Sequence, residues 1–379
     1  MRPLPRILYI EGSGNLAGGG QISLLELLRH LSRDKFAAKL VCPAQGDLTS
    51  AVERLDIKTI ILPMRSPRKN PLAFLPGVRK LRRALVEWGA DLVHANTSRA
   101  ALYAGLAAKP LRIPVVWHVR VIEGEGLYDR YLVGLCAQLI AISQAVRQRF
   151  QWLLKTDPAK VTVIHNGVDL LAFNPQIRGD DMRRELNLPS CAPVAGIVGN
   201  LLAWKGHECF LRAAQEVLAG IPAARFLVVG DGECRAHLER LSQTPELKGK
   251  VIFTGRRSDI PRLMAAMDVL VHSSISPEPF ARVVIEGMAM GLPVVAMNEG
   301  GVPEIIEDGV SGVLIPPKNP ALMARTVMDL FANREKARQI GRMARRRTEE
   351  YFSIEKNARA TEEVYRQALL DSRQLDSSQ

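Results

Sequence analysis

Short apolar runs alternate along this chain with longer segments in which apolar residues recur at the period of a helix. A short, nearly continuous apolar run is typical of a buried strand, and the periodic segments between the runs are typical of helices. The runs of the first half are residues 6–12, 37–43, 57–63, 91–97, 114–120 and 138–143. Those of the second half are residues 194–200, 225–232, 250–255, 269–274 and 292–298.

This alternation predicts parallel sheets with helices on both faces. Because there are two such series and 379 residues exceed what one core usually supports, we expect an α/β protein with two doubly wound, Rossmann-like domains. The turn residues in VTVIHNGVDLLAFNP, 161–175, predict the boundary. We expect an N-terminal domain at 1–170, a C-terminal domain at 171–350, and a final helix at 351–379 that crosses back towards the first domain and frays from residue 371.

Ligands of open parallel sheets bind at the carboxyl ends of the strands, so two facing sheets place the site in the cleft between them. The loop after the first predicted strand carries Gly18–Gly20 directly before a helix, where bare amides form a cradle for phosphate or sugar hydroxyls or, equally, a flexible turn. Its spacing does not complete a dinucleotide fingerprint. His118 follows another predicted strand, and such a histidine is either structural or functional.

The loops of the second half carry further candidates. Lys205 lies just ahead of a predicted helix, where an ammonium joins the helix dipole against phosphate, although most lysines are simply solvated. Gly230 and Arg256 lie in two other strand-to-helix loops.

Two glutamates bracket the start of a predicted helix in SSISPEPFARVVIEGMAMGLPVVA, residues 273–296. The helix covers residues 282–290 and is stopped by Gly291 and Pro293. Glu278 lies in the loop before it and Glu286 on its second turn, so a helix N-terminus lies between two hydroxyl acceptors. That order suits ribose, diphosphate and hexose. The alternative is a turn cap and an exposed helix residue.

Together these segments resemble the retaining glycosyltransferases of the GT-B fold, specifically glycosyltransferase family 4, over nearly the whole chain. The resemblance implies that Glu278 contacts the donor sugar, Glu286 holds the ribose, and Lys205 neutralises the leaving diphosphate. It further assigns donor binding to the backbone of Phe280, Ala281, Val283 and Val284, to Gly18, Gly19 and Gly20, and to Asn200, Gly230 and Arg256. His118 would lie beside the transferred sugar and, with Lys205 and Glu278, forms the expected catalytic set.

Two positions depart from the family pattern. Asn200 stands where members usually carry Arg, and Ala281 where they usually carry Gly. The implied reaction transfers a hexosyl group from a nucleoside-diphosphate sugar to an acceptor hydroxyl with retention, without a metal or cofactor. The departures keep open a non-catalytic nucleotide-sugar-binding or scaffold subunit. A nucleotide-sugar epimerase of the same fold is a third reading.

The formal net charge of +12 predicts an anionic partner. The basic residues concentrate between Lys58 and Val86, with no acid among them. They are Lys58, Arg65, Arg68, Lys69, Arg79, Lys80, Arg82 and Arg83. The apolar positions at helical spacing in this segment are Phe74, Leu75, Val78, Leu81, Leu85 and Trp88.

Such a helix packs its apolar side on the sheet and can turn Arg79, Lys80, Arg82 and Arg83 to an anionic membrane surface. We therefore expect a glycan or lipid-linked acceptor and a role in cell-envelope polysaccharide synthesis. Nucleic acid is disfavoured because no aromatic residues interleave with the charge. No apolar run is long enough to span a bilayer, and five scattered cysteines lack a CxxC spacing, so we expect a cytoplasmic protein, peripheral on the inner face of the membrane.

Overall fold

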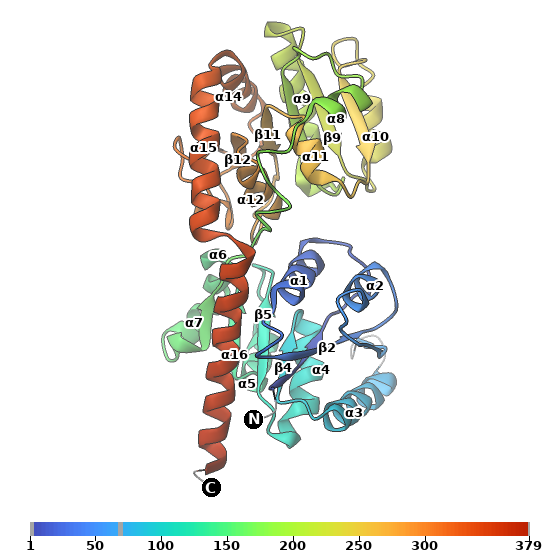
Figure 1. Ribbon diagram of the computed structural model, residues 1–379, viewed down its shortest axis with the longest axis vertical. Helices are drawn as coiled ribbons and strands as arrows, with labels where there is room; N and C mark the ends of the chain where they lie inside the picture. The colour runs from blue at the N-terminus through green and yellow to red at the C-terminus, as the bar shows by residue number, and fades with distance from the viewer. Residues whose placement is uncertain (1–3, 67–70, 378–379) are drawn as a thin grey trace. The chain divides into compact units, whose positions relative to one another are not determined.

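The computed structural model describes residues 4–66 and 71–377 and divides into two compact units. Unit 1 comprises Met1–Gly167 and Ile354–Gln379, and unit 2 comprises Val168–Ser353. Each unit is built on one parallel sheet, labelled in Figure 1. The chain passes between the units close to the expected boundaries after residues 170 and 350.

The unit 1 sheet has the strand order β3-β2-β1-β4-β5-β6-β7, all parallel. Its strands are β1 Arg6–Ile10, β2 Ala37–Cys42, β3 Thr59–Ile61, β4 Leu92–Ala95, β5 Val115–Val119, β6 Gln138–Ala141 and β7 Val161–Val163. Helices cover both faces, which explains why the central strands are mostly apolar and almost entirely buried. The order reverses between β1 and β4, and ligands of such sheets bind at that switch point.

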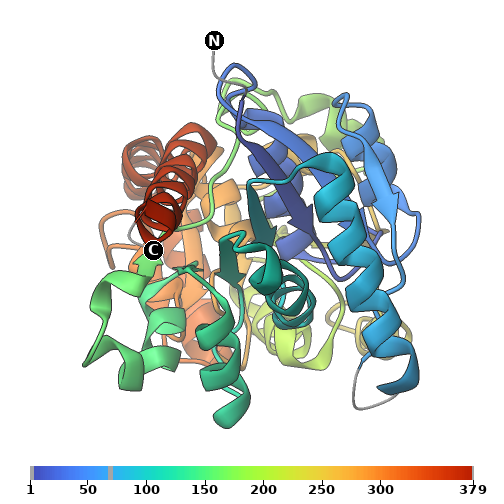
Figure 2. The same cartoon turned by 90° about the horizontal axis from the view of Figure 1, so that it is seen from below.

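The two faces of this sheet are covered by different helices. α1 Gly19–His30 and α16 Ile354–Ser377 pack against each other, and α16 lies along β4, β5 and β6. α4 Ser98–Ala108 packs between α3 Pro71–Trp88 and α5 Leu127–Leu135, and α3 runs along the outside of unit 1 in Figure 2. The shorter helices of unit 1 are α2 Asp47–Glu53, α6 Gln144–Arg147 and α7 Gln151–Leu154.

The last helix is part of the unit 1 core. The ring of Tyr365 is buried, and its hydroxyl lies 2.7 Å from Nδ1 of His94 in β4. Glu362 accepts a hydrogen bond from the amide of Ser32, just after α1, at 2.9 Å. The helix continues to Ser377, so the segment from Asp371 that we expected to fray is helical up to that residue.

The unit 2 sheet has the parallel order β10-β9-β8-β11-β12-β13. Its strands are β8 Val194–Val198, β9 Arg225–Val229, β10 Val251–Gly255, β11 Val269–His272, β12 Val294–Met297 and β13 Val313–Ile315. The switch point lies between β8 and β11. The helices are α8 Asp180–Glu185, α9 His207–Gly220, α10 Arg235–Leu241, α11 Ile260–Ala265, α12 Arg282–Ala289, α13 Val302–Ile305, α14 Pro320–Ala332 and α15 Arg334–Tyr351.

α12 begins where the sequence predicts and ends one residue earlier, at Ala289, and α15 packs against it. The two helices approach so closely that a methyl group on Gly341 would lie 2.1 Å from the carbonyl oxygen of Gly291. Beside this contact, Nη1 of Arg345 donates to the carbonyl of Ala289 at 2.8 Å and to that of Phe173 at 2.7 Å. One guanidinium therefore joins α12 to the first segment of unit 2.

Candidate active site

The loop after β8 is fastened to the end of β11 at the switch point of unit 2. Ser273, which follows β11, donates its hydroxyl to the carbonyls of Lys205 at 3.0 Å and Gly206 at 2.9 Å. Gly206 has φ of +70°, and a methyl group there would lie 1.9 Å from the carbonyl oxygen of Ser273. Only glycine fits this position, which sets the direction in which Lys205 leaves the loop.

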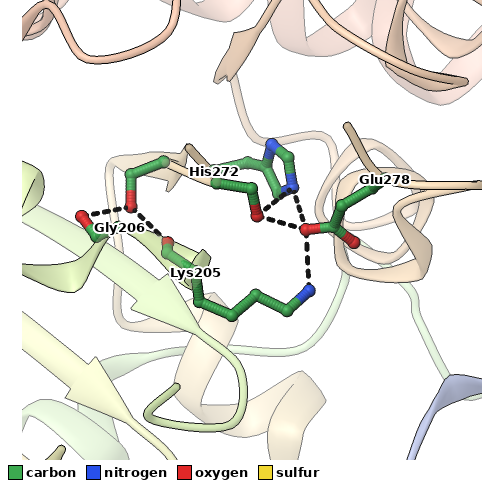
Figure 3. A network of polar contacts seen from close by, with 6 residues as sticks. Lys205, Gly206, His272 and Glu278 are labelled. Carbon is green, nitrogen blue, oxygen red and sulfur yellow. Dashed lines mark hydrogen bonds and ion pairs between the residues drawn. The ribbon is translucent and has the colours of Figure 1, made fainter. Parts of the chain in front are cut away.

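Lys205 and Glu278, 73 residues apart, form an ion pair at this end of the sheet. Oε1 of Glu278 accepts from Nζ of Lys205 at 2.7 Å, lies 2.7 Å from Nε2 of His272, and accepts from the hydroxyl of Ser274 (Figure 3). Glu278 is buried, and burial alone would raise the pKa of its carboxyl group. His272 and Lys205 outweigh burial and hold that pKa well below its ordinary value. Glu278 is therefore an ionised acceptor.

A pair of glycines holds the backbone of Glu278. The amide of Gly301 donates to the carbonyl of Glu278 at 2.8 Å. Gly300 has φ of +63°, and a methyl group there would lie 2.2 Å from the same oxygen. The sequence GGV after β12 is thus required for the carboxylate to lie where it does.

The start of α12 follows four residues after Glu278. Its cap residue Ala281 offers no side-chain hydrogen bond to the first amides, although its carbonyl accepts from the amide of Val284 at 3.1 Å. The first turn, which includes Val283 and Val284, is the positive end of the helix dipole, where an anion can bind. Glu286 lies one turn further and pairs with Arg282 at 3.0 Å. Both glutamates are therefore held by cations from this unit.

The other predicted donor-binding residues of unit 2 also lie at the carboxyl edge of its sheet. Gly230 follows β9 and donates its amide to the carbonyl of Gly255, the last residue of β10, at 3.0 Å. Arg256 comes next and is exposed, as is Asn200 after β8. Phe280 is buried, with its ring 6.0 Å from that of Phe352.

A second polar network lies at the switch point of unit 1. Glu11 follows β1 and is fully buried, and it accepts hydrogen bonds from the amide of Gly12 and from the side chain of Asn96 after β4. Asn96 in turn accepts from Nε of Arg120 at 2.7 Å, and Nη1 of Arg120 donates to Asn166 at 2.9 Å. The network joins the ends of β1, β4, β5 and β7.

The glycine loop packs on this network. Gly18 caps α1, and Gly19 and Gly20 are its first residues, as the sequence predicts. The carbonyl of Gly20 accepts from Asn96 at 3.3 Å, and a methyl group on Gly20 would lie 3.2 Å from the side chain of Arg120. The loop therefore packs against the polar side chains of Asn96 and Arg120.

His118 lies inside β5, not beyond the end of a strand as we expected from the sequence. Its ring is 1 % exposed and packs edge-on against His94 at 5.3 Å. Burial, Arg120 and His94 lower the pKa of His118 well below its ordinary value, and burial lowers that of His94 to about 3. Both rings are neutral at neutral pH. Nε2 of each is buried without a hydrogen-bond partner among the described residues.

The basic helix α3 departs from the predicted pattern at two residues. Arg82 is half-buried and donates to the carbonyls of Ala107 at 3.3 Å and Leu106 at 3.1 Å, at the end of α4. Leu75, which we placed on the packed side, is 56 % exposed. The exposed basic residues are thus Arg79, Lys80 and Arg83, whereas Arg68 and Lys69 lie outside the described residues.

Comparison with known proteins gives two family matches that divide the chain as its sheets do. Residues 17–170 match Glycosyltransferase Family 4, and residues 179–347 match Glycosyl transferases group 1. This chain belongs to glycosyltransferase family 4. The fold of this glycosyltransferase is GT-B, as in a crystal structure of Alr3699/HepE from Anabaena in complex with UDP-glucose. That structure is 28 % identical with a TM-score of 0.83, and the match covers 96 % of this chain and 99 % of the other.

Two curated relatives add to this family assignment. This glycosyltransferase is 31 % identical to spore coat protein SA of Bacillus subtilis over 64 % of its own length and 67 % of the relative's. It is 26 % identical to the UDP-Gal:alpha-D-GlcNAc-diphosphoundecaprenol alpha-1,3-galactosyltransferase of Escherichia coli over 82 % and 84 % of the two chains. No helix in residues 4–66 and 71–377 has the length and hydropathy to cross a membrane.

The sequence did not reveal which side chains surround the predicted residues of this glycosyltransferase. His272 and Ser274 contact Glu278, and Glu11, Asn96 and Asn166 hold Arg120. One signal was available for three of them, because Glu11 and Asn96 directly follow a strand and His272 ends one. Ligands bind where the strand order reverses, so polar residues at the carboxyl ends of the strands on either side of that point are candidate site residues.

Proposed function

We propose that this protein is a retaining hexosyltransferase that takes a hexosyl group from a nucleoside-diphosphate sugar. The observation that carries the proposal is the Lys205–Glu278 pair at the switch point of unit 2, next to the start of α12. In this assignment Glu278 accepts hydrogen bonds from the hexose. Glu286 accepts from the ribose hydroxyls, and the diphosphate binds the first turn of α12 between them.

The electrostatic task of this reaction is the negative charge that develops on the leaving diphosphate. An ammonium at Lys205 and oriented amides at Val283 and Val284 stabilise that charge in place. Because these groups come from the chain itself, we propose that transfer needs neither metal nor cofactor. UDP-hexoses are the first donors to test, since the Escherichia coli relative is named for UDP-Gal and HepE crystallises with UDP-glucose.

The proposed role of His118 follows from its neutral ring. A neutral imidazole can exchange a hydrogen bond with a hydroxyl of the transferred sugar, but it cannot supply positive charge to the diphosphate. This separation leaves charge stabilisation to Lys205. We assign that hydrogen bond to Nε2 of His118, which is buried and has no partner within the described part of the chain.

The acceptor we propose is lipid-linked or part of a cell-surface glycan, reached at an anionic membrane surface. The support lies on α3, where Leu72 is 89 % and Leu75 56 % exposed, and both precede the exposed Arg79, Lys80 and Arg83 on the same helix. Apolar side chains beside cations are typical of helices that lie in the headgroup region of a bilayer. The galactosyltransferase relative is named for a diphosphoundecaprenol acceptor.

Transfer is tested with the purified full chain, a panel of UDP- and GDP-sugars, and undecaprenyl-diphosphate-linked sugar in detergent. We expect a product whose anomeric configuration, read by NMR, equals that of the donor and whose formation persists in EDTA. Glu278→Ala and Lys205→Ala should each abolish turnover. An inverted product refutes retention, and loss of turnover in EDTA refutes metal independence.

Membrane binding is tested by flotation with phosphatidylcholine vesicles, with and without phosphatidylglycerol. A basic residue near an anionic surface contributes about 1 kcal/mol, so Arg79→Ala with Arg83→Ala should weaken binding ~30-fold. Arg338→Ala with Arg342→Ala is the control, because it removes the same charge from exposed positions of α15. Equal loss in both pairs refutes a role for α3.

A non-catalytic nucleotide-sugar-binding subunit is the second candidate. The observation in its favour is Asn200, which is exposed at the position where family members carry an arginine for the diphosphate. This candidate predicts donor binding in calorimetry with no transfer to any acceptor and no donor hydrolysis. Gain of turnover in Asn200→Arg would identify the missing charge as the cause.

A further inference from the structure

The two oxygens of the Glu278 carboxylate have different surroundings. Lys205, His272 and Ser274 all direct their donors to Oε1, as Figure 3 shows for the two labelled side chains. No described residue donates to Oε2, and Oε2 is not among the buried polar atoms that lack a partner. One oxygen is therefore saturated, and the other is accessible and available.

We propose that His272 and Ser274 are positioning residues that commit Oε1 of Glu278, so that Oε2 alone is presented to a hydroxyl of the donor sugar. The inference rests on the proposed function, because it needs Glu278 to bind the hexose. It adds two residues that neither the sequence pattern nor the family resemblance singled out.

The tautomer of His272 follows from its partner. An ionised carboxylate only accepts hydrogen bonds, so Nε2 of His272 carries the proton that points to Oε1. The hydroxyl of Ser274, 3.2 Å from the same nitrogen, donates to Oε1 as well. Nδ1 of His272 is buried with no partner among the described residues. Burying a ring nitrogen without a hydrogen bond costs free energy. The contribution that this ring makes in return is its hydrogen bond to Glu278.

His272 and Ser274 differ from Lys205 in mobility. His272 is the last residue of β11, and both His272 and Ser274 are buried, so their donors are fixed by the sheet. Lys205 is half-buried at the end of a flexible side chain, and it is also the proposed partner of the diphosphate. When its ammonium turns to the diphosphate, the two donors fixed by the sheet remain on Oε1 and keep the carboxylate in place.

The donors around Glu278 also set the pH range in which its carboxylate is ionised and can accept a hydrogen bond from the sugar. The titratable groups that bear on it are His272 of β11 and Lys205 of the loop after β8, and together they lower its pKa against the effect of burial. Without His272 the pKa of Glu278 rises. Protonation of the carboxylate, which removes an acceptor, then begins at a higher pH.

The test compares wild type, His272→Phe, His272→Gln and Ser274→Ala, using UDP and UDP-glucose as probes. Gln offers an amide N–H that can replace Nε2, whereas Phe fills the space without a donor. We expect His272→Phe to lower kcat/KM and UDP-glucose affinity about tenfold, the value of one hydrogen bond to a charged group. UDP affinity should change less than about twofold because UDP lacks the hexose. His272→Gln should recover most of the loss.

The pH profile supplies a second readout. In His272→Phe the acid limb of kcat/KM should move to higher pH, and in His272→Gln it should lie closer to wild type. Equal impairment of both variants, or loss of UDP and UDP-glucose binding together, would mean that His272 only packs, and the inference is overturned. Wild-type behaviour of His272→Phe and Ser274→Ala overturns it as well. Turnover in Glu278→Ala is a different result, since it refutes the proposed function itself.

Discussion

Arg345 offers a quantitative test of how unit 2 holds α12, the helix that carries the proposed donor-binding residues. The residue lies on α15, and its guanidinium donates at 2.7 Å to Phe173 and at 2.8 Å to Ala289, the last residue of α12. A longer bond of 3.5 Å reaches the carbonyl of Leu170. Arg345→Ala removes all of these donors and leaves the two nearer carbonyls without them.

The magnitude follows from those contacts. A hydrogen bond from a charged donor contributes about 1.5–3 kcal/mol. Because the side chain of Arg345 is 19 % exposed, water can replace part of each bond, and we take the lower value for each of the two short bonds to carbonyls. We take nothing for the long bond, and nothing for the pair of Nε with the half-exposed Glu349 at 2.6 Å. The free energy of unfolding of unit 2 should fall by about 3 kcal/mol. In a domain of this size, 1 kcal/mol lowers the Tm by about 2–4 °C, so we expect a decrease of ~6–12 °C.

Differential scanning calorimetry of the full chain measures this shift. Arg342→Ala is the matched control, because it lies on the same helix and its pair with Glu335 at 3.0 Å is exposed on both sides. Exposed pairs contribute about 0–1 kcal/mol, so its Tm should fall by less than ~4 °C. If the two variants unfold at the same temperature, the guanidinium does not fix α12 and the reasoning is wrong. If the reasoning holds, donor affinity falls in Arg345→Ala as well.

Three further perturbations test other parts of the structure. Glu286→Ala should weaken donor binding in calorimetry by at least about tenfold, since it removes a charged acceptor from the ribose, and unchanged affinity would refute that role. Gly300→Ala should destabilise the protein more than Gly309→Ala, because both have positive φ but a methyl group meets a carbonyl only at Gly300; equal unfolding in urea would show that the clash relaxes. His94 and His118 are neutral in the fold with pKa values lowered from 6.5, so stability present above pH 6.5 is lost as pH falls. At pH 5 each should have lost about 2 kcal/mol, and a urea profile of His94→Gln as steep as wild type would contradict this.

The sequence predicted most of the fold because the strands of a covered parallel sheet are apolar runs. Each of the eleven predicted strands is present at the expected place. β7 and β13 were missed, and both are three-residue strands at the sheet edges. β3 is equally short but lies within the longer apolar run 57–63, which made it visible in the sequence. α12 was predicted to within one residue because Gly291 and Pro293 terminate it by local chemistry.

The candidate site was less predictable, because its pairings join residues far apart along the chain. The sequence indicated Lys205 and Glu278 separately, but not that they would bind each other or share His272. Arg82 shows the same limit on α3, since a helical period places it among cations while the end of the neighbouring α4 turns it inward. The sequence pattern predicts on which helix, strand or loop a residue lies, but tertiary packing determines which residue it contacts.

The return of the chain to unit 1 after β13 and α15 has a consequence for synthesis on the ribosome. The unit 1 core contains Ala358, Val364, Tyr365, Ala368 and Leu369, which are translated only after all of unit 2. The domain that begins first is therefore the one that is completed last. A nascent chain exposes the face of β4 to β6 until its final helix emerges, and a premature stop before Ile354 would damage the first domain, not the second.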